Sequence, residues 1–464
     1  MQKSKFIEIF TTLSKVEQNR FQKWVNSPYH NQQQALIELL AYFLKAKTYS
    51  LEAAHKATFP KQKFNAQKLR NHLSYLQKLL EDFLVHEALE QAPQWKQNFL
   101  LSIYRERNAS KGFQATARKQ QVMLEKEPYR NIAYYYSEYC LQEEKYLFLE
   151  QQKRLENKNL QEVLDSLDTY YLANKLKYCV VALTHQQVFS THYQLHHIED
   201  ILRQVEEGGW LKIPTIAVYY YSYQALADSN NIEACQQLKT TFLKHWDLFE
   251  SSELKEFYLI TINFFIKQLN YGYRAFAEEV FALYQSGLEH GVFIQQEQLS
   301  RFTYKNIAAV GMMCKAYTWV EGFIEQYMSY LPQMHQATYG AYNKAKLYYQ
   351  TKEYKKAMNC LQEIEPIDRE LIIDSKVTLM KIYYELEEYT PLEALLESFG
   401  MYIRRNKELS SYLKTNYQNL IKYFRKLQQY NFYEEATRLA LVKRVEEEAQ
   451  LPERQWLLEQ LAKN

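Results

Sequence analysis

Glycine and proline are scarce in this sequence. It has 10 Gly and 9 Pro among 464 residues, about a third of the share found in an average protein. Folds that need many tight turns or glycine-rich phosphate loops, such as β-sandwiches, propellers and dinucleotide-binding sheets, are hard to build from that supply. The one Gly-Gly pair, Gly208 and Gly209, lacks the lysine and hydroxyl of a nucleotide-binding loop. The composition therefore disfavours these classes.

Long apolar runs and closely spaced cysteines are also missing. The most apolar stretch, residues 257–266, is half the length of about 20 residues that a membrane span needs. The 5 cysteines are odd in number and far apart, which offers neither a disulfide framework nor a zinc knuckle. The N-terminus has no small-residue cleavage site. We therefore expect a cytoplasmic protein with reduced thiols and no membrane contact.

What the sequence does have is helical periodicity from end to end, and its first 92 residues predict a helical module. A helix is expected from the Ser14–Glu17 capping box to Asn26, and further helices over 32–45, from Ser50 to before Pro60, and after an Asn65 cap. In the last of these, apolar residues spaced 4, 3, 4 and 3 predict one buried stripe: Leu69, Leu73, Leu76, Leu80 and Phe83. Pro93 is expected to close the module.

Residues 338–365 carry the clearest hairpin. One helix has small and large residues at regular spacing, a polar turn covers 350–353, and a second helix repeats the spacing until Pro366. Small residues let two helices approach closely where they cross. The residues that carry this pattern are Ala345, Tyr348, Tyr354, Ala357 and Leu361.

Similar segments recur at intervals in the second half. Their anchors stand at residues 231, 273, 319, 354, 389 and 433, a drifting period within the range of helical-hairpin repeats. The anchor at 389 is followed by a second capping-box pattern, Thr390 to Glu393, whose helix is expected to end at Gly400 in a left-handed cap. A final helix carrying Trp456 would cover the end of the array.

The five residues that carry the pattern of the 338–365 hairpin resemble the small, aromatic, aromatic, small and large positions of the tetratricopeptide repeat. The chain departs from the repeat where Ala341 replaces the first-helix tryptophan and where the late proline is displaced to Pro366. The chain also resembles a group of Bacteroidota proteins with an Asn-Ser-Pro-Tyr motif near the start, here residues 26–29, and such helices behind. The resemblance implies an all-α superhelix, and the broader repeat family implies peptide or protein binding on a concave surface.

We expect three parts: a basic helical module over 1–92, joining hairpins over 93–209, and tetratricopeptide-like repeats with a capping helix over 210–464. The charge is unevenly placed, because residues 1–80 hold 13 Lys or Arg and 4 acids, or 13 − 4 = +9, in a chain of net charge +3. A basic face of this kind attracts phosphate backbones. The candidate nucleic-acid contacts are Lys61, Lys63, Lys68 and Arg70. The alternative, ordinary solvated helix faces, is favoured.

Two further patterns suggest binding sites but have simpler explanations. His185, His192, His196 and Asp200 would line one face of a continuous helix and could hold a divalent metal, but a histidine-rich surface is the preferred interpretation. The tyrosine clusters over 134–139 and 219–223 could stack unpaired bases, yet consecutive tyrosines spread around a helix, which favours core packing.

The sequence therefore predicts a non-catalytic scaffold or adaptor that holds a peptide or partner helix in a solenoid groove, with no cofactor. The alternative is a nucleic-acid-associated regulator that uses the basic module, with the repeats as sensor. An enzyme ranks third.

Overall fold

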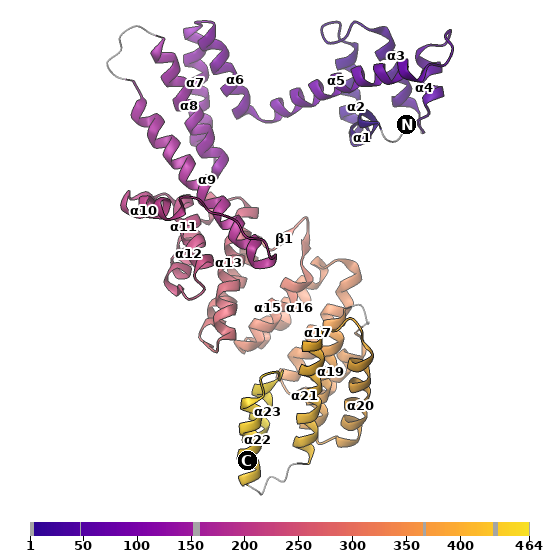
Figure 1. Ribbon diagram of the computed structural model, residues 1–464, viewed down its shortest axis with the longest axis vertical. Helices are drawn as coiled ribbons and strands as arrows, with labels where there is room; N and C mark the ends of the chain where they lie inside the picture. The colour runs from indigo at the N-terminus through magenta and orange to yellow at the C-terminus, as the bar shows by residue number, and fades with distance from the viewer. Residues whose placement is uncertain (1–3, 47, 152–157, 365–367, 430–434, 464) are drawn as a thin grey trace. The chain divides into compact units, whose positions relative to one another are not determined.

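The computed structural model describes residues 4–46, 48–151, 158–364, 368–429 and 435–463, and α-helices dominate them (Figure 1). These residues contain 23 α-helices, three short 3₁₀ turns and one hairpin. The hairpin consists of two strands of two residues each, in which β1 (Ile294–Gln295) pairs antiparallel with β2 (Gln298–Leu299). The predicted all-α class is confirmed. The predicted superhelical repeat type stays a prediction.

The chain forms two compact units. The N-terminal unit comprises Met1–Tyr220 with Asp247–Phe249, and the C-terminal unit comprises Tyr221–Trp246 with Glu250–Asn464. The N-terminal unit contains α1 (Lys5–Phe10), α2 (Lys15–Asn26), α3 (Gln34–Lys45), α4 (Leu51–Thr58), α5 (Ala66–Gln91), α6 (Pro93–Glu106), α7 (Ser110–Lys126), α8 (Ile132–Glu150), α9 (Leu160–Val188), α10 (Ile198–Glu207) and the turn η1 (Trp210–Lys212). The boundary falls within α11 (Pro214–Ala227) and η2 (Trp246–Leu248).

The C-terminal unit consists of helices joined by short turns. They are α12 (Ile232–Lys244), α13 (Ser251–Asn270), α14 (Phe276–Glu289), α15 (Arg301–Met313), α16 (Tyr317–Tyr327), η3 (Met328–Tyr330), α17 (Gln333–Gln350), α18 (Tyr354–Gln362), α19 (Arg369–Glu385), α20 (Tyr389–Arg405), α21 (Ser411–Gln428), α22 (Glu435–Glu447) and α23 (Arg454–Ala462). Neighbouring helices pair as α13 with α14, α15 with α16, α17 with α18, and α19 with α20. The first helices of successive pairs also touch, since α15 contacts α17 and α17 contacts α19.

Local sequence signals account well for the first five helices. The Ser14 capping box forms in full, because Ser14 Oγ accepts from the Glu17 amide and the Glu17 carboxylate accepts from the Ser14 amide. Ser50 and Asn65 cap α4 and α5 as predicted. All five residues of the predicted α5 stripe are buried, and they pack in one core with α1–α4.

One detail of this region differs from the sequence prediction. The chain has an additional helix, α1, which buries Phe6, Ile7 and Phe10. At six residues it is too short for periodicity to identify it. Helix α5, the last of the module, ends at Gln91, and Pro93 begins α6 directly, because the first helical position needs no amide donor.

Two predicted signals in the C-terminal unit are wrong. Helix α20 begins at Tyr389 with Glu388 at its N-cap, so Thr390 forms no capping box. The Glu393 carboxylate instead accepts from Arg425 Nη2 at 2.7 Å. Gly400 does not end the helix in a left-handed cap, since α20 runs on to Arg405. The buried Phe399 and Ile403 hold that last turn against the core.

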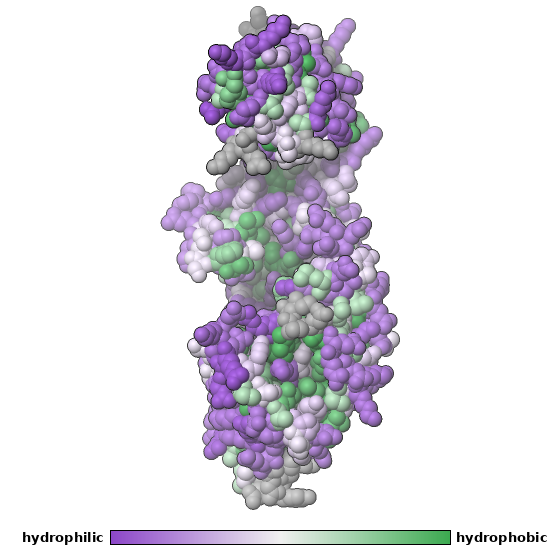
Figure 2. Space-filling view, turned by 90° about the vertical axis from the view of Figure 1, so that its right-hand side faces the viewer, coloured by the Kyte–Doolittle hydropathy of each residue, from purple (hydrophilic) through white to green (hydrophobic). Residues whose placement is uncertain are grey.

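In the part of the chain that the structure describes, no helix combines the length and the apolar character that crossing a bilayer requires. Figure 2 shows one face of the molecule, where hydrophilic side chains predominate and apolar ones gather in smaller areas.

Candidate binding surfaces

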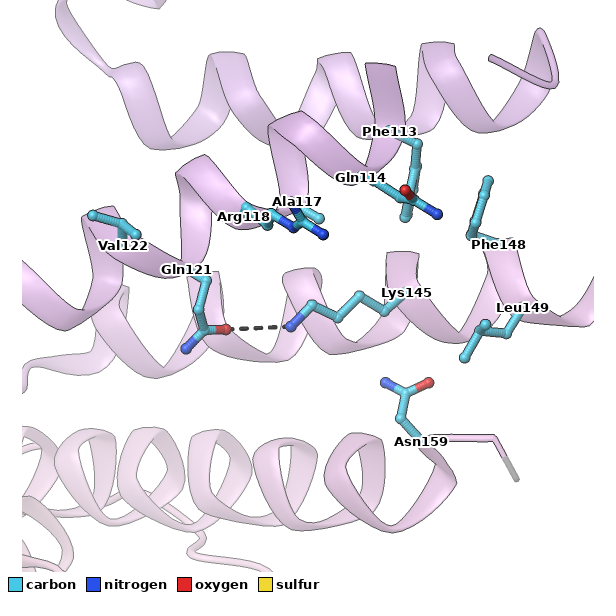
Figure 3. A pocket seen from close by; sticks show the side chains of 10 residues that line it. All are labelled: Phe113, Gln114, Ala117, Arg118, Gln121, Val122, Lys145, Phe148, Leu149 and Asn159. Atoms are coloured by element: carbon cyan, nitrogen blue, oxygen red, sulfur yellow. Dashed lines mark hydrogen bonds between the residues drawn. The ribbon is translucent and has the colours of Figure 1, made fainter. Parts of the chain in front are cut away.

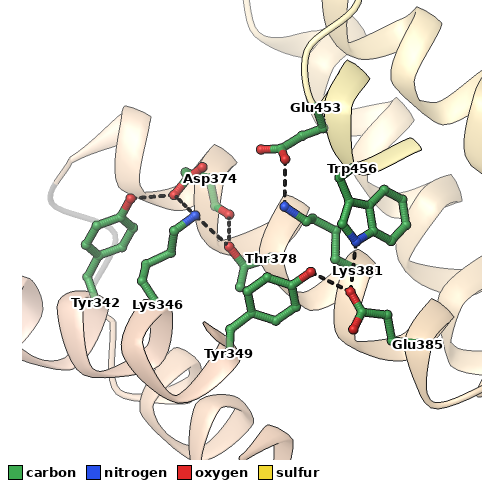
Figure 4. Close-up of polar contacts among 9 residues, drawn as sticks. All are labelled: Tyr342, Lys346, Tyr349, Asp374, Thr378, Lys381, Glu385, Glu453 and Trp456. Carbon is green, nitrogen blue, oxygen red and sulfur yellow. Dashed lines mark hydrogen bonds and ion pairs between the residues drawn. The ribbon is translucent and has the colours of Figure 1, made fainter. Parts of the chain in front are cut away.

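A cluster of polar and ionised side chains joins α17, α19 and the start of α23 (Figure 4). Helix α17 contributes residues spaced 4 and 3 apart, and α19 contributes residues spaced 4, 3 and 4 apart, so each set lies along one helix face. The members are Tyr342, Lys346, Tyr349, Asp374, Thr378, Lys381, Glu385, Glu453 and Trp456. We call this set the polar cluster.

Glu385 is the most enclosed acid of the polar cluster, with 4% of its side chain exposed. Its carboxylate accepts from Tyr349 Oη at 2.5 Å, from Trp456 Nε1 at 2.8 Å, from Lys352 Nζ at 2.8 Å, and from Tyr354 Oη. Burial alone would raise its pKa, but these donors outweigh burial and lower the pKa of Glu385 to about 2. The group is therefore a fixed anion at neutral pH and no proton donor.

A second ion pair joins the same faces of α17 and α19, and on both helices it lies N-terminal to the residues around Glu385. Lys346 Nζ is 3.0 Å from Asp374 Oδ2 and 3.3 Å from Thr378 Oγ1, and the Tyr342 hydroxyl also donates to Asp374. Burial opposes ionisation of Asp374, yet the Lys346 charge and the Tyr342 hydrogen bond together lower its pKa. The Asp374 side chain is 35% exposed, so water still reaches this pair.

Lys381 ties the C-terminal helix to the polar cluster. Its Nζ is 2.6 Å from Glu453 Oε2 and lies over the rings of Tyr349 and Trp456, at 5.1 and 5.7 Å from their centroids. The Trp456 ring also packs against Phe424, with centroids 5.0 Å apart. Helix α23 therefore packs on α19 and α21 through the Trp456 ring, and the ion pair between Lys381 and Glu453 lies beside this contact.

The arrangement of the polar cluster favours a structural role over acid–base chemistry. Glu385 and Asp374 each have a cation and at least one further donor, so protonation of either would break several hydrogen bonds at once. Glu453 is held by its ion pair with Lys381. The spacing of these residues on α17 and α19 was visible in the sequence. The sequence could not show which acid meets which cation, because the partners lie 28 to 72 residues apart.

A different kind of surface lies between α7 and α8, where the N-cap of α9 also contributes (Figure 3). It is a cleft of about 600 Å³, within the size range of ligand pockets. Its lining residues are Phe113, Gln114, Ala117, Arg118, Gln121, Val122, Lys145, Phe148, Leu149 and Asn159. The Phe113 and Phe148 rings stack 4.0 Å apart at one end. We call this surface the α7–α8 cleft.

Two cations border the α7–α8 cleft. Lys145 extends from α8 towards α7, where its Nζ is 3.2 Å from Gln121 Oε1 (Figure 3). Burial lowers the pKa of Lys145, although the charges of Glu138 and Glu162 partly offset it. Arg118 is exposed on α7. Within the described residues, neither cation has a carboxylate in ion-pair contact, so the cleft combines apolar walls with positive charge that is not neutralised there.

The four candidate nucleic-acid residues lie close in sequence but differ in surroundings. Lys61 and Lys63 are exposed in the turn before α5, and Arg70 is exposed in its second turn. Among the described residues no ion pair engages these three. Lys68 is committed within the protein, because its Nζ donates to Gln62 Oε1 at 2.7 Å and lies 4.3 Å from the Phe59 ring centroid.

The repeat-signature residues meet in the α17–α18 hairpin. Ala345 and Ala357 are both fully buried, as expected for small residues at a helix crossing. Tyr348, Tyr354 and Leu361 are partly buried against the same small core. The turn covers residues 351–353, one residue shorter than the predicted 350–353, with Lys352 in the left-handed conformation at φ 66°. The predicted proline stop at Pro366 and the anchor at 433 lie outside the described residues.

The alternative metal site does not form. Helix α9 ends at Val188, so His192 and His196 do not continue the face that carries His185. Among the described residues no three His, Cys, Asp or Glu side chains gather closely enough to hold a metal ion. Of the tyrosine clusters, Tyr135 and Tyr219 are examples of rings buried in the protein, which agrees with the core-packing interpretation.

Comparison of the chain with protein-family models, with curated proteins and with solved structures found no match. The tetratricopeptide and Bacteroidota resemblances therefore stay predictions from the sequence.

Proposed function

We propose that this protein is a non-catalytic scaffold that binds a segment of a partner protein, and that the α7–α8 cleft receives a segment bearing both apolar and acidic side chains. The observation that carries the proposal is the pairing of apolar walls with the cations Arg118 and Lys145. An apolar side chain gains by leaving water. A carboxylate beside Lys145 would also relieve the cost of keeping that ammonium half-buried.

The dimensions of the α7–α8 cleft suit a short peptide segment. From Phe113 to Val122 its α7 wall extends nine residues, or about 14 Å along the helix axis. That length matches about two and a half turns of a bound helix or about four residues of an extended strand. Affinity in such clefts comes from a few anchors, and the stacked Phe113 and Phe148 rings offer the largest apolar contact area.

Selection from a random peptide library against the purified full-length protein tests this proposal. We expect enriched peptides to carry Asp or Glu within four residues of a large apolar side chain. Lys145→Met and Arg118→Glu should each weaken binding of a selected peptide about tenfold or more, measured by fluorescence anisotropy. Lys119→Glu makes the same charge change on the exposed surface of α7, outside the cleft, and should leave the affinity within about twofold.

Two results would contradict the assignment. Enriched peptides without acidic residues would remove the charge argument. Peptides whose affinity is unchanged by both cleft variants would place the binding surface elsewhere, for example in the predicted groove within residues 210–464.

The second candidate function is nucleic-acid binding by the basic module. It is supported by the exposed Lys61, Lys63 and Arg70 beside the start of α5. Anisotropy with a labelled duplex and a labelled single strand, measured at several salt concentrations, tests it. Binding that falls steeply with salt and is lost in the triple Lys61→Ala, Lys63→Ala, Arg70→Ala variant would favour this function. Salt-independent or absent binding would dismiss it.

A further inference from the structure

Helix α9 carries apolar side chains on two opposite faces. One face is buried in the N-terminal unit, through residues that include Leu172, Leu176 and Val180. The other face is exposed to solvent and is also apolar. Large exposed apolar surfaces are unusual in proteins that function alone, and they mark interaction sites. Helix α9 is 29 residues long and is drawn in Figure 1. Its exposed apolar face therefore needs an explanation.

Large exposed apolar residues on this face follow a heptad spacing, and two partly buried residues, Asn174 and His185, occupy its remaining positions. Positions separated by 4, 3, 4, 3, 4 and so on run along the whole helix, and seven of the nine are large apolar side chains with 37% to 71% exposure. The nine positions are Leu160, Leu164, Leu167, Tyr171, Asn174, Tyr178, Val181, His185 and Val188. We call this set the α9 stripe. A 3.5-residue period keeps one seam facing a partner helix, which is the requirement of a coiled coil.

We propose that the α9 stripe is a homodimer interface, in which α9 of a second copy of this chain packs antiparallel against it. In the antiparallel orientation, the residues of one stripe face those of the other at every level. Tyr171 of each copy then lies level with Asn174 of the other, Leu167 with Tyr178, and Leu164 with Val181. Such a twofold arrangement uses the same patch on both subunits, as most symmetric dimers do.

The charges beside the α9 stripe select this orientation. Asp168 and Lys175 each follow a stripe residue, so they lie on the same flank, one heptad apart. In the antiparallel pair, Asp168 of one copy comes opposite Lys175 of the second copy, and the twofold axis repeats this pair. A parallel pair would place the same two charges beside Val163 and Tyr170 instead, which offer no countercharge. Flanking charges of this kind set partner choice and direction in helix pairs.

The inference is independent of the proposed function, because the α9 stripe and the α7–α8 cleft share no residue. Light scattering on the full-length protein tests it first. The chain has a mass of 55.8 kDa, so a dimer should give twice that value. Leu164→Glu should return the mass to that of the monomer, whereas Leu439→Glu, a matched change at another exposed leucine on α22, should leave the dimer intact.

Charge reversal then tests the direction. Asp168→Lys and Lys175→Asp should each raise the dimer dissociation constant about tenfold, because each places like charges opposite one another twice. Mixing these two single variants should restore dimerisation, since every Lys then meets an Asp across the pair. Asp165→Lys changes the charge of an exposed residue one turn away and should have little effect. Circular dichroism would confirm that each variant keeps its helix content.

Three outcomes would overturn the inference. The wild type could remain a monomer at concentrations of hundreds of micromolar. A dimer that survives Leu164→Glu would place the interface on another surface, such as the exposed Trp95, Phe99 and Ile103 of α6. Failure of the mixed charge variants to dimerise, when the wild type does, would exclude the antiparallel pairing.

Discussion

The polar cluster around Glu385 leads to a quantitative prediction about stability and pH. Glu385→Gln keeps the size of the side chain but removes its negative charge, so the four donors that now converge on a carboxylate would share one neutral acceptor. The pKa of Glu385 falls from its ordinary value of 4.5 to about 2 in the folded protein. At 1.36 kcal/mol for each pKa unit, this shift corresponds to about 3 kcal/mol of stability at neutral pH.

The sign of the pH dependence follows from the direction of the shift. A carboxyl group whose pKa is lowered by folding binds protons more readily in the unfolded chain. Its contribution is therefore complete above pH 4.5 and disappears as the pH falls towards 2. We expect wild type and Glu385→Gln to differ by about 3 kcal/mol at pH 7 and to converge at low pH.

Urea unfolding followed by circular dichroism at a series of pH values measures this difference. Subtracting the variant from the wild type cancels the titration of the other carboxylates. Glu397→Gln on the exposed surface of α20 is the matched control and should change the free energy of unfolding by less than about 0.5 kcal/mol. A loss below about 1 kcal/mol at pH 7, or a difference that does not shrink below pH 4, would refute the view that Glu385 is a fixed, buried anion.

Three further predictions concern local structure. Ser14→Ala removes the capping box of α2 and should cost about 1 kcal/mol of unfolding free energy in urea titrations; an unchanged value would contradict the role of the cap. Gly287→Ala would place a methyl group 2.2 Å from the Phe293 ring, and should lower the unfolding free energy by about 1–3 kcal/mol. By contrast, Gly322→Ala meets no atom within 4 Å in the middle of α16 and should stabilise the protein by about 1 kcal/mol, seen as a higher melting temperature. A reversed order of stability for these two glycine variants would show that space around the Cβ position does not decide the outcome.

Helix class and several helix boundaries are properties that the sequence determines by itself, because both depend on neighbours within about four residues. Ser14, Ser50 and Asn65 illustrate this, since each caps the helix that its position predicts. The buried stripe from Leu69 to Phe83 is likewise a consequence of spacing along one helix. Where a local signal competed with packing, packing prevailed: Gly400 remains within a helix whose last turn is held by buried neighbours.

Both candidate binding surfaces depended on the tertiary structure. The α7–α8 cleft needs Arg118 and Lys145, 27 residues apart in sequence, to border one apolar space. The heptad spacing of α9 was present in the sequence, but a stripe of apolar residues is usually taken as core, and only the packing of its opposite face shows which stripe is left to solvent. Nothing in the sequence around Glu385 indicates its lowered pKa. The shift arises from donors on α17, α18 and α23 that lie 31 to 71 residues away in sequence, since hydrogen bonds and desolvation act through space and not along the chain.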